Sequence, residues 1–91
     1  MRQQRFNDVF DAICDTPEEA ENLKLRAVLM RELASRIASM SQQEAAALLG
    51  VTQPRISELV RGKIQYFALD KLVTMAAHAG LHVTMTVQNR N

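Results

Sequence analysis

The chain has 91 residues with a formal net charge of +1, and 47% of them are hydrophobic but only 4% aromatic. This length fits one domain with a modest core, and a composition rich in Leu, Ile, Val, Ala and Met favours helices over a β-sandwich or barrel. No apolar run approaches the roughly 18–20 residues that cross a membrane, and the N-terminus lacks the apolar segment of a signal peptide. The single cysteine, Cys14, excludes an intrachain disulfide, so we expect a protein of the reducing cytoplasm.

Charge is distributed unevenly along the chain. Residues 1–21 contain two basic and six acidic side chains, a net charge of −4, whereas residues 22–91 contain nine basic and four acidic ones, a net charge of +5. This asymmetry suggests a polyanionic partner for the body and a basic partner for an acidic arm, residues 1–15. The alternative is an ordinary solvated surface.

The first long helix is predicted to begin after Thr16, because Pro17 suits the first helical position and Glu19 completes a capping box. Nothing interrupts it before Ser39. Aliphatic residues recur every four positions, with Val28 beside them, and predict a stripe that faces the core: Leu25, Leu29, Leu33 and Ile37.

Two short helices follow. Ser41 and Glu44 form a second capping box, and Gly50 supplies the left-handed residue that ends the helix. The next helix is expected over about residues 53–61, ending at Gly62.

Pro54 leaves two frames open for the start of this third helix. Thr52 is the cap with Pro54 at the second helical position, or Gln53 is the cap with Pro54 at the first. In both frames the missing N–H of Pro54 breaks no helical bond, because the first N–H groups of a helix have no intrahelical partner.

A fourth helix is expected over about residues 69–79, stopped by Gly80, with an inner face of Leu69, Leu72, Val73, Ala76 and Ala77. The segment after it alternates strictly, which predicts a strand over residues 81–88 with one apolar face: Leu81, Val83, Met85 and Val87. Because a lone strand leaves its backbone groups unpaired, we expect it to pair with the same strand of a second copy across a two-fold axis. The alternative is a C-terminal extension that lies on the protein's own surface.

Four residues at fixed positions relative to one another predict a helix-turn-helix over about residues 41–62. Gln42 opens the first helix, Ala46 is small enough for a close helix contact, Gly50 lies in the turn, and Ile56 points back with Val51 and Leu59 beside it. The alternative is a structural helical hairpin with a solvated polar face.

Polar side chains remain on the outer surface of this unit, and they favour DNA binding over the alternative. Arg and Gln suit guanine and adenine edges in the major groove, and a helix N-terminus or a terminal cation suits phosphate. The predicted DNA-binding residues are Gln42, Gln43, Thr52, Gln53, Pro54, Arg55, Ser57, Glu58, Arg61 and Lys63.

The stretch SQQEAAALLGVTQPRISELVRGK, residues 41–63, resembles the XRE, lambda-repressor-like helix-turn-helix family. A wider match over about residues 23–88 resembles its small one-domain branch of HigA-like antitoxins. The resemblance implies a mainly α, compact lambda-repressor-like bundle of about five helices. Together with the pattern of residues 81–88, it predicts a helix-turn-helix domain over residues 16–91 whose C-terminal β-strand pairs across a homodimer. It also implies a bacterial repressor of its own promoter, bound to a palindromic double-stranded DNA operator.

Within that family, the residues that match Gln42, Thr52, Gln53, Arg55, Ser57 and Glu58 face the major groove. Those that match Arg61 and Lys63 lie near the DNA backbone. This chain departs from the family at two places: IASMSQQ is about two residues shorter than the usual turn, and Ala68 stands where a serine cap is common. The second departure predicts a frayed start to the fourth helix.

Many members of the branch neutralise a RelE/HigB-type mRNA endonuclease, a toxin encoded beside them. The acidic side chains of residues 6–21 suit such a basic partner. The same segment has an apolar stripe, which gives the predicted toxin-binding residues Phe6, Val9, Phe10 and Ile13. The alternative is a stand-alone or phage regulator without a toxin.

An enzyme is not expected. Cys14 has no neighbouring histidine in sequence, and no serine has the context of a nucleophile elbow. Gly80 separates His78 from His82, so the pair is not predicted to share a helical face as metal ligands do. We therefore expect no catalytic residue, metal or cofactor.

Overall fold

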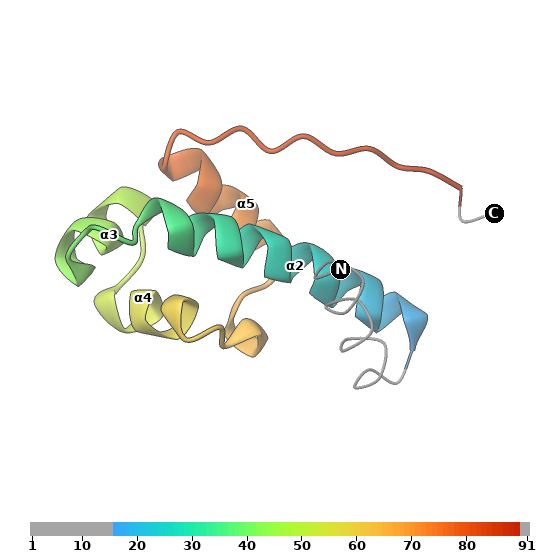
Figure 1. Cartoon of the computed structure of the whole chain (residues 1–91), viewed down its shortest axis with the longest axis horizontal. Helices are drawn as coiled ribbons and strands as arrows, with labels where there is room; N and C mark the ends of the chain where they lie inside the picture. The colour runs from blue at the N-terminus through green and yellow to red at the C-terminus, as the bar shows by residue number, and fades with distance from the viewer. Residues whose placement is uncertain (1–15, 90–91) are drawn as a thin grey trace.

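The computed structural model describes residues 16–89, and the elements of this range are labelled as in Figure 1. Four α-helices and one short 3-10 helix follow one another within it. They are α2 (Pro17–Arg36), α3 (Gln42–Leu49), α4 (Gln53–Val60), the 3-10 helix η1 (Ile64–Tyr66) and α5 (Leu69–His78). The expectation of a compact, mainly helical domain is confirmed for these residues.

α2 begins at the predicted residue with one half of the predicted capping box, but it does not end where predicted. The Thr16 hydroxyl accepts a hydrogen bond from the Glu19 N–H at 3.1 Å, and Pro17 is the first helical residue. The helix ends at Arg36 rather than Ser39, because the Ala38 and Met40 N–H groups turn to the carbonyls of Ser35 and Ile37. These hydrogen bonds span three residues instead of four and so end the α-helix. The chain then takes the extended backbone of Ser41, which caps α3.

The predicted apolar stripe of α2 is only partly correct. Leu33 and Ile37 are buried, but Leu25 and Val28 are 47% and 39% exposed. Positions four residues apart drift by about 40° each time around a helix with 3.6 residues per turn, so a long row of such positions leaves the core. The buried row is Met30, Leu33 and Ile37, whose spacing of three and then four follows the helix face more closely.

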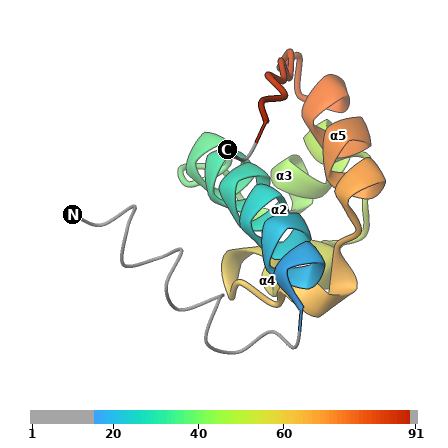
Figure 2. The same cartoon turned by 90° about the vertical axis from the view of Figure 1, so that its right-hand side faces the viewer.

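The core forms where α2 packs against α5 and α3 packs against α4. Figure 2 shows α2 nearly end on, between α5 on one side and α4 on the other. The largest fully buried side chains come from every helical element except η1: Leu33, Leu49, Ile56, Leu59, Leu72 and Met75, together with Phe67 just after η1.

The predicted inner face of α5 is also rotated from the observed one. The helix buries Leu72, Met75 and Ala76, whereas Val73 is 41% exposed and Ala77 is exposed. The observed buried face of α5 is rotated about the helix axis, relative to the predicted one. The rotation is somewhat less than the angle of about 100° between successive residues, and it adds Met75 to the buried face.

Residues 81–89 leave α5 as an extended segment that passes outside α2 (Figure 1). The Leu81 N–H donates to the Ala76 carbonyl at 2.9 Å, and the Leu81 side chain packs on the core. Exposure then rises along the apolar positions, from 38% at Val83 to 70% at Met85 and 84% at Val87. No β-strand is formed within residues 16–89, so strand pairing across a dimer stays a prediction.

Candidate nucleic-acid interface

The first helix of the predicted helix-turn-helix is fixed by its cap. The Ser41 hydroxyl accepts from the Glu44 N–H at 3.1 Å, and the Glu44 carboxylate accepts from the Ser41 N–H at 3.0 Å. Both halves of the predicted capping box are therefore present. They hold Gln42 and Gln43 at the exposed first turn of α3.

Gly50 forms the turn between α3 and α4 with a φ of +71°, and its N–H donates to the Ala46 carbonyl at 2.9 Å. A second feature also favours glycine there. A Cβ atom at this position would lie only 3.2 Å from ring atoms of His78, which is the last residue of α5. The turn thus lies directly against another helix.

The start of α4 decides between the two frames for Pro54. Thr52 is the N-cap residue, with extended backbone, so Gln53 is first in the helix and Pro54 second. The Thr52 side chain makes no capping bond. On the inner side of α4, Ile56 and Leu59 are each 2% exposed, which confirms the predicted contact between the two helices.

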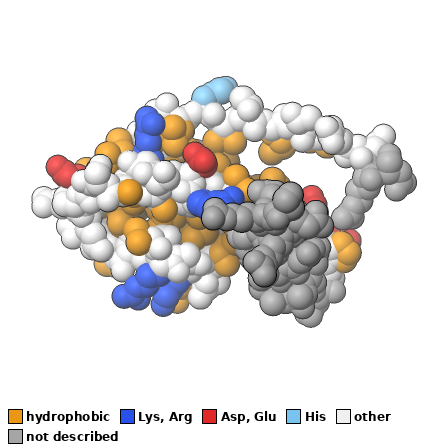
Figure 3. All heavy atoms as spheres, viewed as in Figure 1, with side chains coloured by type: hydrophobic (Ala, Val, Ile, Leu, Met, Phe, Trp, Pro, Cys, Tyr) orange, Lys and Arg blue, Asp and Glu red, His pale blue; other side chains and the backbone are white. Residues whose placement is uncertain are grey.

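All ten predicted DNA-binding residues are at least partly accessible. Six are exposed: Gln42, Gln43, Thr52, Gln53, Pro54 and Arg61. Arg55, Ser57, Glu58 and Lys63 are half-buried. On a helix of 3.6 residues per turn, Pro54, Ser57 and Arg61 project opposite the buried pair Ile56 and Leu59. Figure 3 shows Lys and Arg side chains gathered at the edge of the molecule where α4 lies.

Arg55 is held by neighbours that sequence reasoning did not connect to it. Its Nη1 donates to Glu58 Oε1 at 2.8 Å. Its guanidinium carbon lies 5.6 Å from the centre of the Tyr66 ring and 5.9 Å from that of Phe67. Tyr66 is 49% exposed beside α4, so it is a further surface residue of this site that sequence analysis missed. The only signal was two adjacent aromatic residues in the segment between the third and fourth predicted helices.

Arg26 of α2 fixes the position of those rings. Its Nη1 donates to the carbonyls of Ile64, at 3.3 Å, and Phe67, at 3.2 Å. The Arg26 Nε is buried without a hydrogen-bond partner. The two hydrogen bonds from Nη1 join α2 to η1, a role that nothing in the sequence near Arg26 indicates.

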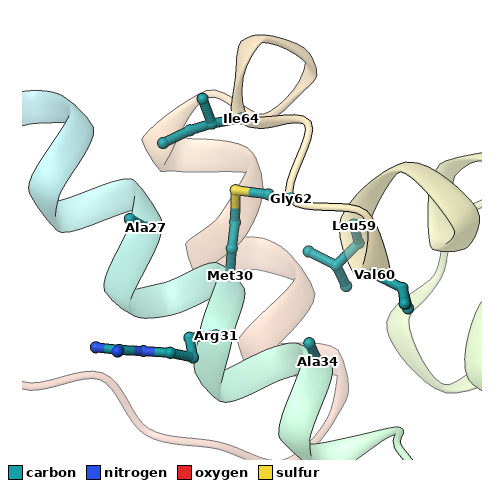
Figure 4. Close-up of a pocket in the computed structure, with 8 residues that line it drawn as sticks. All are labelled: Ala27, Met30, Arg31, Ala34, Leu59, Val60, Gly62 and Ile64. Carbon is teal, nitrogen blue, oxygen red and sulfur yellow. The ribbon is translucent and has the colours of Figure 1, made fainter. Parts of the chain in front are cut away.

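A pocket of about 330 Å³ lies between α2 and the end of α4 (Figure 4). Val60, the exposed aliphatic residue of α4, is 63% exposed and borders this pocket rather than the polar face. The other lining residues are apolar or glycine apart from Arg31: Ala27, Met30, Ala34, Leu59, Gly62 and Ile64.

Other predicted sites are placed only in part. Phe6, Val9, Phe10 and Ile13 lie outside the described residues. Among residues 16–89, no three His, Cys, Asp or Glu side chains come together as a metal site. In the same part of the chain, no helix is both long and apolar enough to span a membrane.

Comparison with known proteins bears on the interface as a whole. A family model described as a helix-turn-helix domain matches residues 12–88, a range that includes every element of the described structure. No curated protein matches the chain.

Proposed function

The chain belongs to the helix-turn-helix domain family, and on this premise we propose that it is a sequence-specific transcriptional repressor that binds double-stranded DNA. One observation supports this above the others. The helices α3 and α4 pack against each other through the turn at Gly50, and α4 carries accessible polar residues on its outer side. A second helix held in this way is the element that enters the major groove in helix-turn-helix proteins.

We assign seven of the ten predicted residues a DNA contact that suits their chemistry. Gln53, Arg55 and Ser57 face bases, since amide and guanidinium groups make paired hydrogen bonds to adenine and guanine. Gln42 and Gln43 bring the N-terminus of α3 to a phosphate. Arg61 and Lys63, after the recognition residues, meet the phosphate backbone as positive charges.

The phosphate role of Arg61 is tested by salt titration. We expect Arg61→Ala to weaken binding to all duplexes alike and to reduce the slope of log affinity against log salt by about 1, because one fewer phosphate contact forms. Lys71→Ala removes an exposed cation of α5 and is the matched control, for which the slope stays unchanged. Equal slopes for both variants contradict the assignment. Fluorescence anisotropy at several salt concentrations provides the measurement.

We further propose a homodimer that pairs its residues 81–88 with those of a second copy. Two observations support it: the exposed apolar positions Val83, Met85 and Val87, and the extended backbone that carries them. A two-fold dimer would place its recognition helices in two half-sites about 34 Å apart, on a palindromic operator.

The resemblance to HigA-like antitoxins supports a finer proposal, in which the acidic arm binds and neutralises a RelE/HigB-type mRNA endonuclease. We expect deletion of residues 1–15 to abolish neutralisation while operator binding survives. Co-expression with the product of the neighbouring gene, scored by cell growth, tests the first half, and a gel shift tests the second. Loss of both activities would mean that the arm is needed for folding instead.

The alternative is a stand-alone or phage regulator with the same DNA-binding surface and no toxin. In either case we propose that the protein acts by binding alone, with no catalytic residue and no cofactor. A small basic open reading frame beside the gene favours the antitoxin, and its absence favours the stand-alone regulator.

A further inference from the structure

We propose that Arg55 reads a guanine and is oriented for this before DNA binds, and that Glu58 and Tyr66 position it instead of contacting bases themselves. This inference rests on the proposed DNA-binding function and deepens it. It changes the role of Glu58, which sequence analysis placed among the groove-facing residues.

Glu58 orients one end of the guanidinium. The ion pair between Arg55 Nη1 and Glu58 Oε1 spans 2.8 Å, and the two side chains are 39% and 28% exposed. Partly exposed pairs of this kind contribute little to stability, so the effect of the pair is on orientation. Arginine has five N–H donors, and among the described residues Glu58 is the one polar partner of this side chain. The edge formed by Nε and Nη2 is left for the paired acceptors O6 and N7 of guanine.

Two aromatic rings limit where the guanidinium plane lies. Its carbon is 5.6 Å from the Tyr66 centroid and 5.9 Å from the Phe67 centroid, distances at which arginine is attracted to a ring. Phe67 is fully buried and forms a fixed wall, whereas Tyr66 is 49% exposed. Tyr66 can therefore be replaced without opening the core.

The rings are in turn fixed by α2. The hydrogen bonds from Arg26 to the Ile64 and Phe67 carbonyls hold η1 at both ends. Three elements, α2, η1 and α4, thus determine the position of one half-buried side chain. A side chain ordered in advance loses less conformational entropy on binding, which raises affinity for the base that fits its geometry.

The experiment is a selection from a duplex library of about 20 randomised base pairs, enough for two half-sites one helical turn apart. Full-length wild type and single variants are selected in parallel, and the bound pools are sequenced. We expect wild type to enrich a motif with guanine at one position of each half-site. Arg55→Ala should lose that preference by about 5- to 150-fold, the range for one bidentate pair, and leave the other positions unchanged.

Replacing either positioning residue should weaken the base preference at the position that Arg55 reads and at no other. We expect Glu58→Gln and Tyr66→Leu each to reduce the guanine preference by about 2- to 10-fold, the cost of ordering one long side chain on binding. Tyr66→Phe keeps the ring and should restore the preference. Glu32→Gln makes the same charge change as Glu58→Gln at an exposed position of α2, and it should leave the motif intact.

The possible outcomes separate this inference from the proposed function. If wild type enriches no sequence, sequence-specific DNA binding itself is wrong. If wild type enriches a motif but Glu58→Gln alters a position that Arg55→Ala does not, Glu58 reads a base directly and the positioning role is refuted. A Tyr66→Leu motif identical to wild type overturns the role of the ring.

Discussion

Gly50 is constrained by its own backbone and by the histidine ring beside it. Its φ is +71°, and a Cβ atom there would approach the His78 ring to 3.2 Å. A residue with a side chain pays about 1–2 kcal/mol in the left-handed region, and here the ring must also shift. We expect Gly50→Ala to lower the free energy of unfolding by at least this amount, as measured by urea denaturation.

Gly62→Ala is the matched control for that variant. Its φ is +74°, but no atom lies within 4 Å of an added Cβ, so it carries the backbone cost alone. The extra loss at Gly50 should disappear when His78 is also replaced by alanine. Equal losses for Gly50→Ala and Gly62→Ala would show that the ring moves aside at no cost.

At the level of helices, the sequence predicted starts better than ends and buried faces. A capping bond joins residues three apart, as in Thr16 with Glu19 and Ser41 with Glu44, so its signal is local. The burial of Met30 and Met75 depends instead on which helices pack against them.

The same limit applies to the candidate site. The polar face of α4 follows from helical spacing, and the sequence predicted it. The hydrogen bonds from Arg26 reach residues that are 38 and 41 positions further along the chain, so no local sequence pattern predicts them. Tyr66 belongs to η1, which those bonds join to α2, and it reaches the site through its contact with Arg55.

The start of α5 is uncapped and should accept a better residue. Ala68 has the extended backbone of an N-cap, with φ −70° and ψ 155°, close to the −68° and 161° of Ser41. Ala68→Ser would supply an oxygen for the free N–H groups of the first turn and should raise the free energy of unfolding by about 1 kcal/mol. Ser41→Ala should lower it by a similar amount. Thermal and urea unfolding of both variants test this, and an unchanged Ala68→Ser contradicts it.

On the scale of the whole molecule, the candidate interface and the C-terminal segment lie on opposite sides of α2. Figures 1 and 2 both show α4 on one side and residues 81–89 on the other. A second copy bound along this segment would therefore leave the polar face of α4 uncovered. The proposed dimerisation and the proposed DNA binding are therefore compatible, and we expect that each can be disrupted alone.

Met85→Lys should weaken the proposed dimer, because a charge on the apolar face of this extended segment opposes its pairing as a strand with another chain. Met85 is 70% exposed in the single chain, so its replacement costs little folding energy there. Thr86→Lys adds the same charge at the next position, on the opposite face of the segment, and should leave the dimer intact. Sedimentation velocity over a range of protein concentrations measures the equilibrium. If both variants stay dimeric, the segment lies on the protein's own surface and the copies meet elsewhere. If Met85→Lys alone becomes monomeric, it should lose affinity for a two-half-site operator yet bind a single half-site as wild-type monomer does.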